Sequence, residues 1–167
     1  MPARDWLASR AIPWDSLDMK TLLAAVDFSD ASQKIVTFAA DLAGALDAKV
    51  VLLHVVEPVA NYVPVGAAMD VIETAPPPVM EEDLNAQRAH LERIAEGVPN
   101  VETVATIGLA ADEILSQAEE RNASMIILGS HGHGALYHLF AGSVVTSVLK
   151  RATAPVVVVP VGEKPRK

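Results

Sequence analysis

The feature that most constrains the fold is a regular alternation between short apolar runs and stretches with helical spacing. The clearest apolar run is Val50–Val56, which is rich in β-branched residues and ends at Glu57-Pro58. Nearly uninterrupted strands of this kind are typical of parallel sheets with both faces covered. The strand-like runs are Lys20–Asp27, Val50–Val56, Val101–Ile107, Met125–Leu128 and Val156–Val159. The helical stretches are Ala31–Leu46, Glu81–Glu96, Asp112–Arg121 and Ser143–Arg151.

The alternation also determines how the elements connect. Strands separated by helices run parallel and cross over with one hand, so the helices cover both faces of the sheet. The composition agrees, since 51% of the residues are hydrophobic and only 4% are aromatic, which leaves an aliphatic core. A chain of 167 residues is long enough to bury such a core in one domain. The sequence therefore predicts an α/β domain with a five-stranded parallel sheet.

Three local patterns carry separate expectations. Asp30 followed three residues later by Gln33 matches a capping box, which predicts the start of the first helix. The segment Asn61–Val79 contains the triplet Pro76-Pro77-Pro78, so we expect a loop of the length usual for lids. Apolar and polar residues alternate in Val101–Ile107, which predicts a strand at or near one edge of the sheet.

Charge and residue usage exclude several classes of protein. The formal net charge of −8 and the pI near 5.0 oppose an extended contact with nucleic acid or anionic lipid. The absence of cysteine excludes disulfides, thiolate metal sites and cysteine nucleophiles. Residues 1–20 lack the apolar segment of a signal peptide, and no apolar run reaches the roughly 20 residues of a membrane span. We therefore expect a cytoplasmic protein with no membrane partner, whose anionic ligand, if it has one, is small.

The segment with the most specific pattern follows the fourth strand-like run. Gly129 and Gly132 begin it, and Gly142-Ser143 close it after nine intervening residues, where a helix is predicted to start. Glycine lets backbone N–H groups approach a ligand, and a helix N-terminus offers free N–H donors with partial positive charge. The pattern thus predicts an anion site that needs no lysine. It is not a P-loop, because the Gly-Lys-Ser/Thr ending is missing, and a dinucleotide-binding glycine motif would follow the first strand.

The carboxyl ends of the first, second and fourth strands are the expected location of a ligand, because the winding direction reverses there. Asp27, Val55 and Gly129 are the candidate residues at these ends. A lone carboxylate such as Asp27 suits the hydroxyl groups of a ribose. As a catalytic base it would also need a positioned nucleophile and groups that stabilise developing charge.

The glycine pattern resembles the universal stress protein family, whose ATP-binding members carry G-2x-G-9x-G-(S/T) after the fourth strand. Here the motif is Gly129, Gly132, Gly142 and Ser143. Other segments that share the likeness are Val26–Ser29, Leu53–Val56, Gly108 and Ala154–Val159. The resemblance implies a Rossmann-like parallel sheet of order 3-2-1-4-5 with helices on both faces. It also implies a universal stress protein domain at residues 20–162, an N-terminal extension at 1–19 and a basic tail at 163–167.

The resemblance further implies binding of ATP, ADP or AMP, with Mg²⁺ as an ion that the phosphates bring. In nucleotide-binding members, the residue that matches Asp27 contacts the nucleoside, and the one that matches Val55 pairs with adenine through its backbone. The implied site comprises Ala25, Asp27, Val55, Leu128, Gly129, Gly132, Gly142, Ser143, Val144 and Val145. Two of these depart from family patterns, since Ala25 replaces a proline of some members and Val145 replaces a threonine.

Two other functions stay open at this point: a nucleotide-free dimeric stress scaffold and a slow ATPase. A metal site is a further alternative, because His131, His133 and His138 lie close together in the sequence. No carboxylate or cysteine accompanies them to complete a zinc site. We therefore expect His131 to face solvent or phosphate, and we assign no catalytic residue and no metal ligand.

The last strand-like run predicts how two copies associate. It comprises Val156, Val157, Val158 and Val159. At the edge of the sheet, the unpaired N–H and C=O groups of such a strand invite another chain, and pairing with the same strand of a second copy closes after two subunits. The resemblance supports this homodimer. In the alternative, Trp6 and Trp14 fold back over the edge and leave a monomer.

Overall fold

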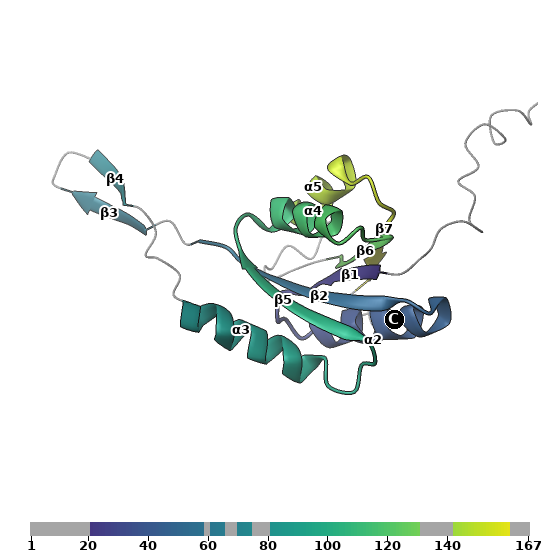
Figure 1. The fold of residues 1–167 in the computed structure, drawn as a ribbon. Helices are drawn as coiled ribbons and strands as arrows, with labels where there is room; N and C mark the ends of the chain where they lie inside the picture. Colours follow the sequence, from purple (N-terminus) through teal and green to yellow (C-terminus); the bar gives the residue numbers. More distant parts are fainter. Residues whose placement is uncertain (1–20, 59–60, 66–69, 75–80, 131–141, 161–167) are drawn as a thin grey trace, which may run out of the picture.

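The computed structural model describes residues 21–58, 61–65, 70–74, 81–130 and 142–160 (Figure 1). The strands are β1 (Thr21–Ala25), β2 (Lys49–Val56), β3 (Asn61–Val65), β4 (Asp70–Thr74), β5 (Val101–Ile107), β6 (Met125–Gly129) and β7 (Val156–Val159). The helices are α2 (Ser32–Leu46), α3 (Glu81–Ile94), α4 (Ala110–Glu120) and α5 (Ser143–Arg151). The expected extension, the basic tail and the prolines at 76–78 lie outside the described residues.

The main sheet has five strands in the order β5-β2-β1-β6-β7, and every pair in it is parallel. In order of appearance these are strands 3-2-1-4-5, so the predicted order is confirmed. The central strand β1 pairs on both sides, since Ala24 lies opposite Leu52 of β2 and Ile127 of β6. The order of the sheet therefore reverses direction beside β1, between β2 and β6.

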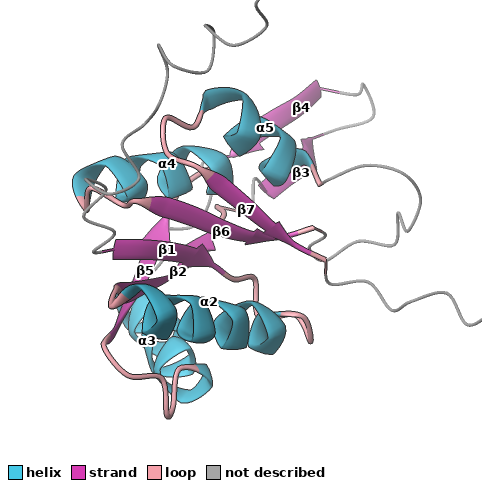
Figure 2. Cartoon of the chain, turned by 90° about the vertical axis from the view of Figure 1, so that its right-hand side faces the viewer, coloured by secondary structure: helices cyan, strands magenta, loops and turns pink. Residues whose placement is uncertain are grey.

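Helices cover both faces of the sheet, as predicted, with α2 and α3 on one side and α4 and α5 on the other (Figure 2). The period of two along each strand sends alternate side chains to opposite faces. In β1, Leu22 and Ala24 join the core with Ile35 of α2, whereas Leu23 joins the core with Val148 of α5. Both layers are aliphatic, which explains how a chain with so few aromatic residues fills its interior.

The two edge strands lie where the sequence places them. Strand β5 forms one edge, as the alternation in Val101–Ile107 predicts, and β7 forms the other. Each residue of β5 is partly exposed, whereas the central strand β1 buries Leu22, Leu23 and Ala24 completely. The position of β7 is confirmed, and its pairing with a second copy stays a prediction.

The segment expected to be one loop contains a β-hairpin instead. Strands β3 and β4 pair antiparallel in a separate two-stranded sheet, with Val63 opposite Ile72 and Pro64 opposite Val71. Proline argues against a central strand, but either strand of a two-stranded sheet has a free edge where a missing N–H is tolerated. The prediction gave Pro64 too much weight as a breaker and is wrong for residues 61–65 and 70–74.

The capping box predicted at the start of α2 is also wrong. The residue that precedes the helix is Ala31, no side chain caps the helix there, and Asp30 is exposed. The side chain that receives hydrogen bonds in this region is Asp27, from Ser29 and from Ser32, the first residue of the helix. The carboxylate that organises the start of α2 thus belongs to the end of β1.

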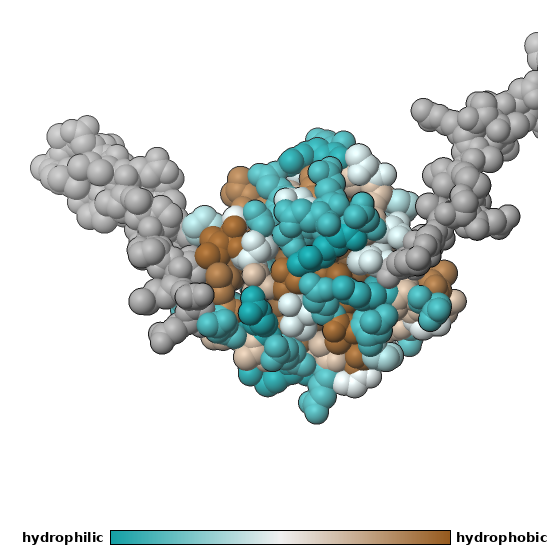
Figure 3. Space-filling model, in the orientation of Figure 1, coloured by the Kyte–Doolittle hydropathy of each residue, from teal (hydrophilic) through white to brown (hydrophobic). Residues whose placement is uncertain are grey.

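Helical periodicity separates the exposed face of α4 from its buried face. Asp112, Ser116 and Glu120 recur at every fourth position, as expected for one face of a helix, and all are exposed. Figure 3 shows polar residues gathered over α4. The opposite side of the helix buries Ile114 and Ala118 against the sheet.

Candidate functional site

The carboxyl ends of the parallel strands emerge at one edge of the sheet, where β1, β6 and β7 point to the same side in Figure 2. Ala25, the last residue of β1, pairs with Leu53 of β2, so Asp27 lies at the level of Val55 near the end of β2. Gly129 ends β6 on the other side of β1. The register therefore places the three candidate strand ends around the point where the strand order reverses.

The apolar residues of the predicted site share one face of the sheet. Leu128 and Val145 are buried in the core under α4 and α5, and Ala25, Val55 and Val144 pack against that same core while staying partly exposed. They come from β1, β2, β6 and α5. Sequence reasoning could not assign them to a face, and the structure places all five on the side of α4 and α5.

The N-terminus of α5 borders this group. Gly142 precedes the helix, its N–H donates to the carbonyl oxygen of Ser130 at 3.3 Å, and its carbonyl accepts from the N–H of Thr146 at 2.9 Å. The N–H groups of the first helical turn have no acceptor within the helix. The first turn carries no acidic residue and Ser143 is exposed. This helix end therefore presents partial positive charge suited to an anion.

Gly142 has no positive φ, so the reason for a glycine at this helix end is not its backbone conformation. Gly142 has φ −52°, and within the described chain the glycines with positive φ are Gly97 and Gly108. A Cβ added at Gly142 would meet no described atom within 4 Å. Among the described residues, neither backbone conformation nor packing requires glycine at this position, so its expected role, the close approach of a ligand, stays a prediction.

Gly132, His131, His133 and His138 lie outside the described residues, so their roles stay predictions. Elsewhere in the described part of the chain, no three His, Cys, Asp or Glu side chains gather in a way that could hold a metal ion.

Asp27 is held in a tight turn directly after β1. Its Oδ1 accepts hydrogen bonds from the N–H of Ser29 at 3.1 Å, from the hydroxyl of Ser29 at 2.6 Å and from the hydroxyl of Ser32 at 3.4 Å. Ser32 is only 3% exposed. The next residue, Phe28, has φ 60°, a left-handed conformation that bulky side chains rarely adopt. The turn fixes the position of the carboxylate at the cost of strain at Phe28.

The rings behind this turn were not predicted as part of the site. Phe28 lies 4.0 Å from His54 and 4.1 Å from His90 of α3, measured between ring centroids. His54 Nδ1 lies 2.9 Å from the carbonyl oxygen of Val26. Because a carbonyl only accepts, this nitrogen carries the proton. No local sequence signal indicates that His54 and His90 contact the same phenyl ring.

The environment of His54 favours its neutral form. Burial lowers the pKa of His54 below its ordinary 6.5, and nearby His90 lowers it further, although the hydrogen bond to Val26 and the charge of Asp27 act in the opposite direction. A neutral imidazole thus supports the backbone directly before Asp27.

The turn between β5 and α4 is fixed next to the end of β2. The N–H of Ala110 donates to Glu57 Oε1 at 3.1 Å, and the Thr106 hydroxyl donates to Glu113 Oε2 at 2.7 Å. A Cβ at Gly108 would lie 2.7 Å from the side chain of Glu113. Glycine at this position therefore allows α4 to approach the end of the sheet closely.

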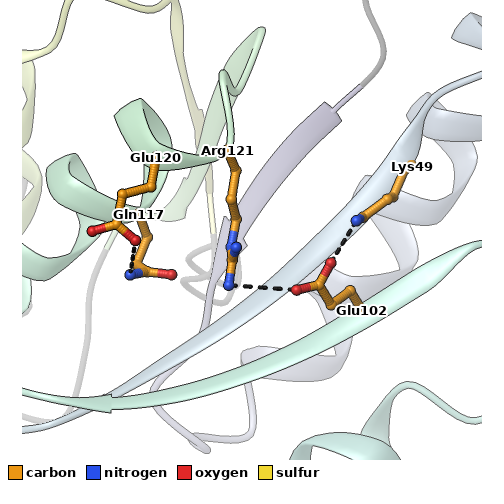
Figure 4. Close-up of polar contacts among 5 residues, drawn as sticks. All are labelled: Lys49, Glu102, Gln117, Glu120 and Arg121. Carbon is orange, nitrogen blue, oxygen red and sulfur yellow. Dashed lines mark hydrogen bonds and ion pairs between the residues drawn. The ribbon is translucent and has the colours of Figure 1, made fainter.

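The amino edge of the sheet holds a separate group of charges (Figure 4). Glu102 of β5 lies between Lys49 at the start of β2, at 2.5 Å, and Arg121 after α4, at 3.4 Å. The hydrogen bond from Lys49 lowers the pKa of Glu102, and the charge of Arg121 acts in the same direction. These ion pairs join an edge strand to its neighbours, far along the strands from Asp27.

Comparison with known proteins adds the family. A sequence profile described as the universal stress protein family matches residues 19–160. The chain belongs to this family. The universal stress protein YxiE of Bacillus subtilis is 34% identical over 147 residues, which cover 83% of this chain and 97% of the relative.

Solved structures of universal stress proteins share the fold. One in complex with cAMP has a TM-score of 0.62 at 20% identity and covers 86% of this chain and 98% of its own. Another, from Archaeoglobus fulgidus in complex with dAMP, has a TM-score of 0.56 at 22% identity, and the match covers 83% of this chain and 96% of that protein.

None of the helices among the described residues is long and apolar enough to span a bilayer.

Proposed function

We propose that this universal stress protein binds an adenine nucleotide, with ATP, ADP or AMP as candidates, at the carboxyl edge of β1, β2 and β6. The observation that carries the proposal is that three features lie at the carboxyl edge of the sheet. These are an apolar surface under α4 and α5, the positive N-terminus of α5 and the fixed carboxylate of Asp27. The cAMP and dAMP complexes of structurally similar proteins support an adenine nucleotide.

The charges of these features suggest the orientation of the ligand. A carboxylate repels phosphate but accepts hydrogen bonds from hydroxyl groups, whereas a helix N-terminus attracts phosphate. The ribose therefore lies toward Asp27 and the phosphates toward Gly142 and Ser143, with Mg²⁺ bound through the phosphates. Adenine then lies near Val55, whose backbone supplies its hydrogen bonds. The domain that performs this function spans residues 20–162.

Replacement of Asp27 by Asn tests the orientation. The loss of a charge-assisted hydrogen bond, worth about 1.5–3 kcal/mol, should lower the affinities for AMP and for ATP by a similar factor of about 10 to 100. Isothermal titration of both nucleotides, with GTP as the specificity control, measures these affinities. A variant that no longer bound ATP but still bound AMP would place Asp27 near the phosphates instead. A wild-type protein that bound no adenine nucleotide would contradict the proposal and favour the nucleotide-free scaffold.

We also propose that two copies associate through β7. This strand lies at the edge of the sheet, and its Val157 and Val158 stay partly exposed. Light scattering at micromolar concentration should give the mass of two chains, and Val158→Lys should reduce it to one. Glu119→Lys, at an exposed position of α4, controls for the added charge. A wild-type mass of one chain would contradict the dimer.

A further inference from the structure

The rings of Phe28, His54 and His90, here called the ring stack, lie on the opposite side of the sheet from the proposed nucleotide site. Phe28 packs against the core under α2 and α3, whereas Ala25 and Val55 pack under α4 and α5. The rings of Phe28 and His90 are nearly parallel, with 9° between their planes, and His54 is tilted by 32°. The stack thus lies behind the Asp27 turn and does not line the ligand site.

Phe28 contacts both histidines. Its ring centroid lies 4.0 Å from that of His54 and 4.1 Å from that of His90. His54 comes from β2 and His90 from α3, so two elements together fix one side chain of the turn.

The fixed ring explains how the strained backbone persists. A left-handed conformation at a bulky residue lasts only where its surroundings determine it. Val26, two residues earlier, is held by its N–H, which donates to Leu53 at 2.9 Å, and by its carbonyl, which contacts His54 Nδ1. With Val26 and Phe28 both fixed, the backbone of Asp27 between them has little freedom to move.

We propose that Phe28, His54 and His90 are positioning residues that hold the Asp27 carboxylate in its binding orientation, so that α3 acts on the ligand site through His90. The positioning of Asp27 stands on the contacts of this chain, and only its consequence for ribose binding rests on the proposed nucleotide function. Loss of the His90 ring lets Phe28 leave its left-handed conformation, and the carboxylate then moves away from Ser29 and Ser32.

The first test needs no ligand. The N–H of Ser29 donates to Asp27, so its hydrogen exchange reports on the turn. His90→Leu removes the ring at similar size and should raise the exchange rate of this amide by about three- to tenfold, the range expected for one aromatic pair. His90→Phe keeps a ring and should restore the wild-type rate. Glu92→Leu, at an exposed position of the same helix, should change nothing.

The exchange result decides the inference. An unchanged Ser29 rate in a folded His90→Leu protein, or equal rates in His90→Leu and His90→Phe, would overturn the positioning role. Protection of the buried β2 residue Val51 in each variant shows that the fold is intact. A merely structural loss would raise exchange at Val51 and Ser29 together.

The second test joins the stack to ribose recognition. His90→Leu should lower the affinity for AMP by about three- to tenfold. The affinity for 2′,3′-dideoxy-AMP should be unchanged, because that analogue lacks the hydroxyls that donate hydrogen bonds to Asp27. Equal affinities of wild type and His90→Leu for AMP would refute the action of α3 on the site. If the wild-type protein binds neither ligand, the nucleotide proposal fails, and the Ser29 rate alone decides whether the stack positions Asp27.

Discussion

The amino and carboxyl edges of the sheet each hold a fixed carboxylate, but they hold it in different ways. At the amino edge, Glu102 is bound by the cations Lys49 and Arg121, so charge is balanced by charge. At the carboxyl edge, Asp27 Oδ1 accepts hydrogen bonds from the N–H and hydroxyl of Ser29 and from the hydroxyl of Ser32. These donors belong to the turn and the first residue of α2, so they fix Asp27 locally, whereas the contacts of Glu102 join β5 to β2 and to the residue after α4.

The largest expected effect comes from a charge placed at the helix end of the carboxyl edge. Ser143→Asp puts a carboxylate in the first turn of α5, where it repels phosphate, and ATP affinity should fall at least about tenfold. The same charge favours the helix dipole, so the free energy of unfolding should rise by about 0.3–1 kcal/mol. Calorimetric titration and urea denaturation measure the two quantities. Ser143→Asn, which adds no charge, should leave both nearly unchanged.

A ligand site and a structural site differ in what Ser143→Asp does: at a ligand site, ATP affinity falls while the free energy of unfolding rises. If Ser143→Asp lowered both quantities, the helix end would be packed against protein instead of open to a ligand. If ATP affinity were unchanged in the folded variant, the phosphates would lie elsewhere.

The second effect concerns pH and the ring stack. The pKa of His54 is lowered by burial, so near pH 6.5 the unfolded chain binds more protons than the folded one. The contribution of His54 is therefore complete above pH 6.5 and is lost as the pH falls toward its lower folded pKa. Protonation would also place charge beside His90 and near Asp27, the titratable groups that act on it.

Urea denaturation between pH 5 and pH 8 checks this sign. The wild-type protein should lose stability below pH 6.5, by less than the tenfold change in folding equilibrium per pH unit that one proton allows. His54→Gln removes the titrating group and should flatten this part of the profile. His90→Gln, at the other histidine in contact with Phe28, is the matched control. A wild-type profile that rises as the pH falls would contradict the assigned direction.

The sequence could predict the sheet but not the arrangement behind the site. Runs such as Val50–Val56 indicate strands because burial on both faces leaves no polar alternation, and the family resemblance supplied their order. The hairpin at residues 61–65 and 70–74 was missed because Pro64 suits a two-stranded sheet as well as a loop. The spacing of Asp30 and Gln33 predicts a capping box, but in the folded chain Asp27 accepts the hydrogen bonds from Ser29 and Ser32 at the start of α2.

The ring stack shows why residues that support the site leave no local signal in the sequence. His90 lies on α3, where the spacing of the apolar residues indicates only that one face of the helix packs inward. No nearby residue indicates that Phe28 is its partner. The left-handed backbone at Phe28 is equally hidden, since glycine is the residue that usually marks such a position. Contacts between side chains that are distant in sequence have to be seen in three dimensions.

The smallest expected effect lies at the amino edge. Glu102 is 40% exposed, so Glu102→Gln should lower the free energy of unfolding by less than about 1 kcal/mol, and salt should reduce this difference further. Because the pKa of Glu102 is lowered from 4.5, its contribution is present above pH 4.5 and is lost as the pH falls through the folded value. The free energies of unfolding of the wild-type and variant proteins should therefore converge in acid.

Glu119→Gln, on the exposed face of α4, is the matched control, and AMP affinity should be the same in all three proteins. A change in AMP affinity in Glu102→Gln would mean that the two edges of the sheet are coupled, which a network confined to the starts of β2 and β5 and the end of α4 does not predict.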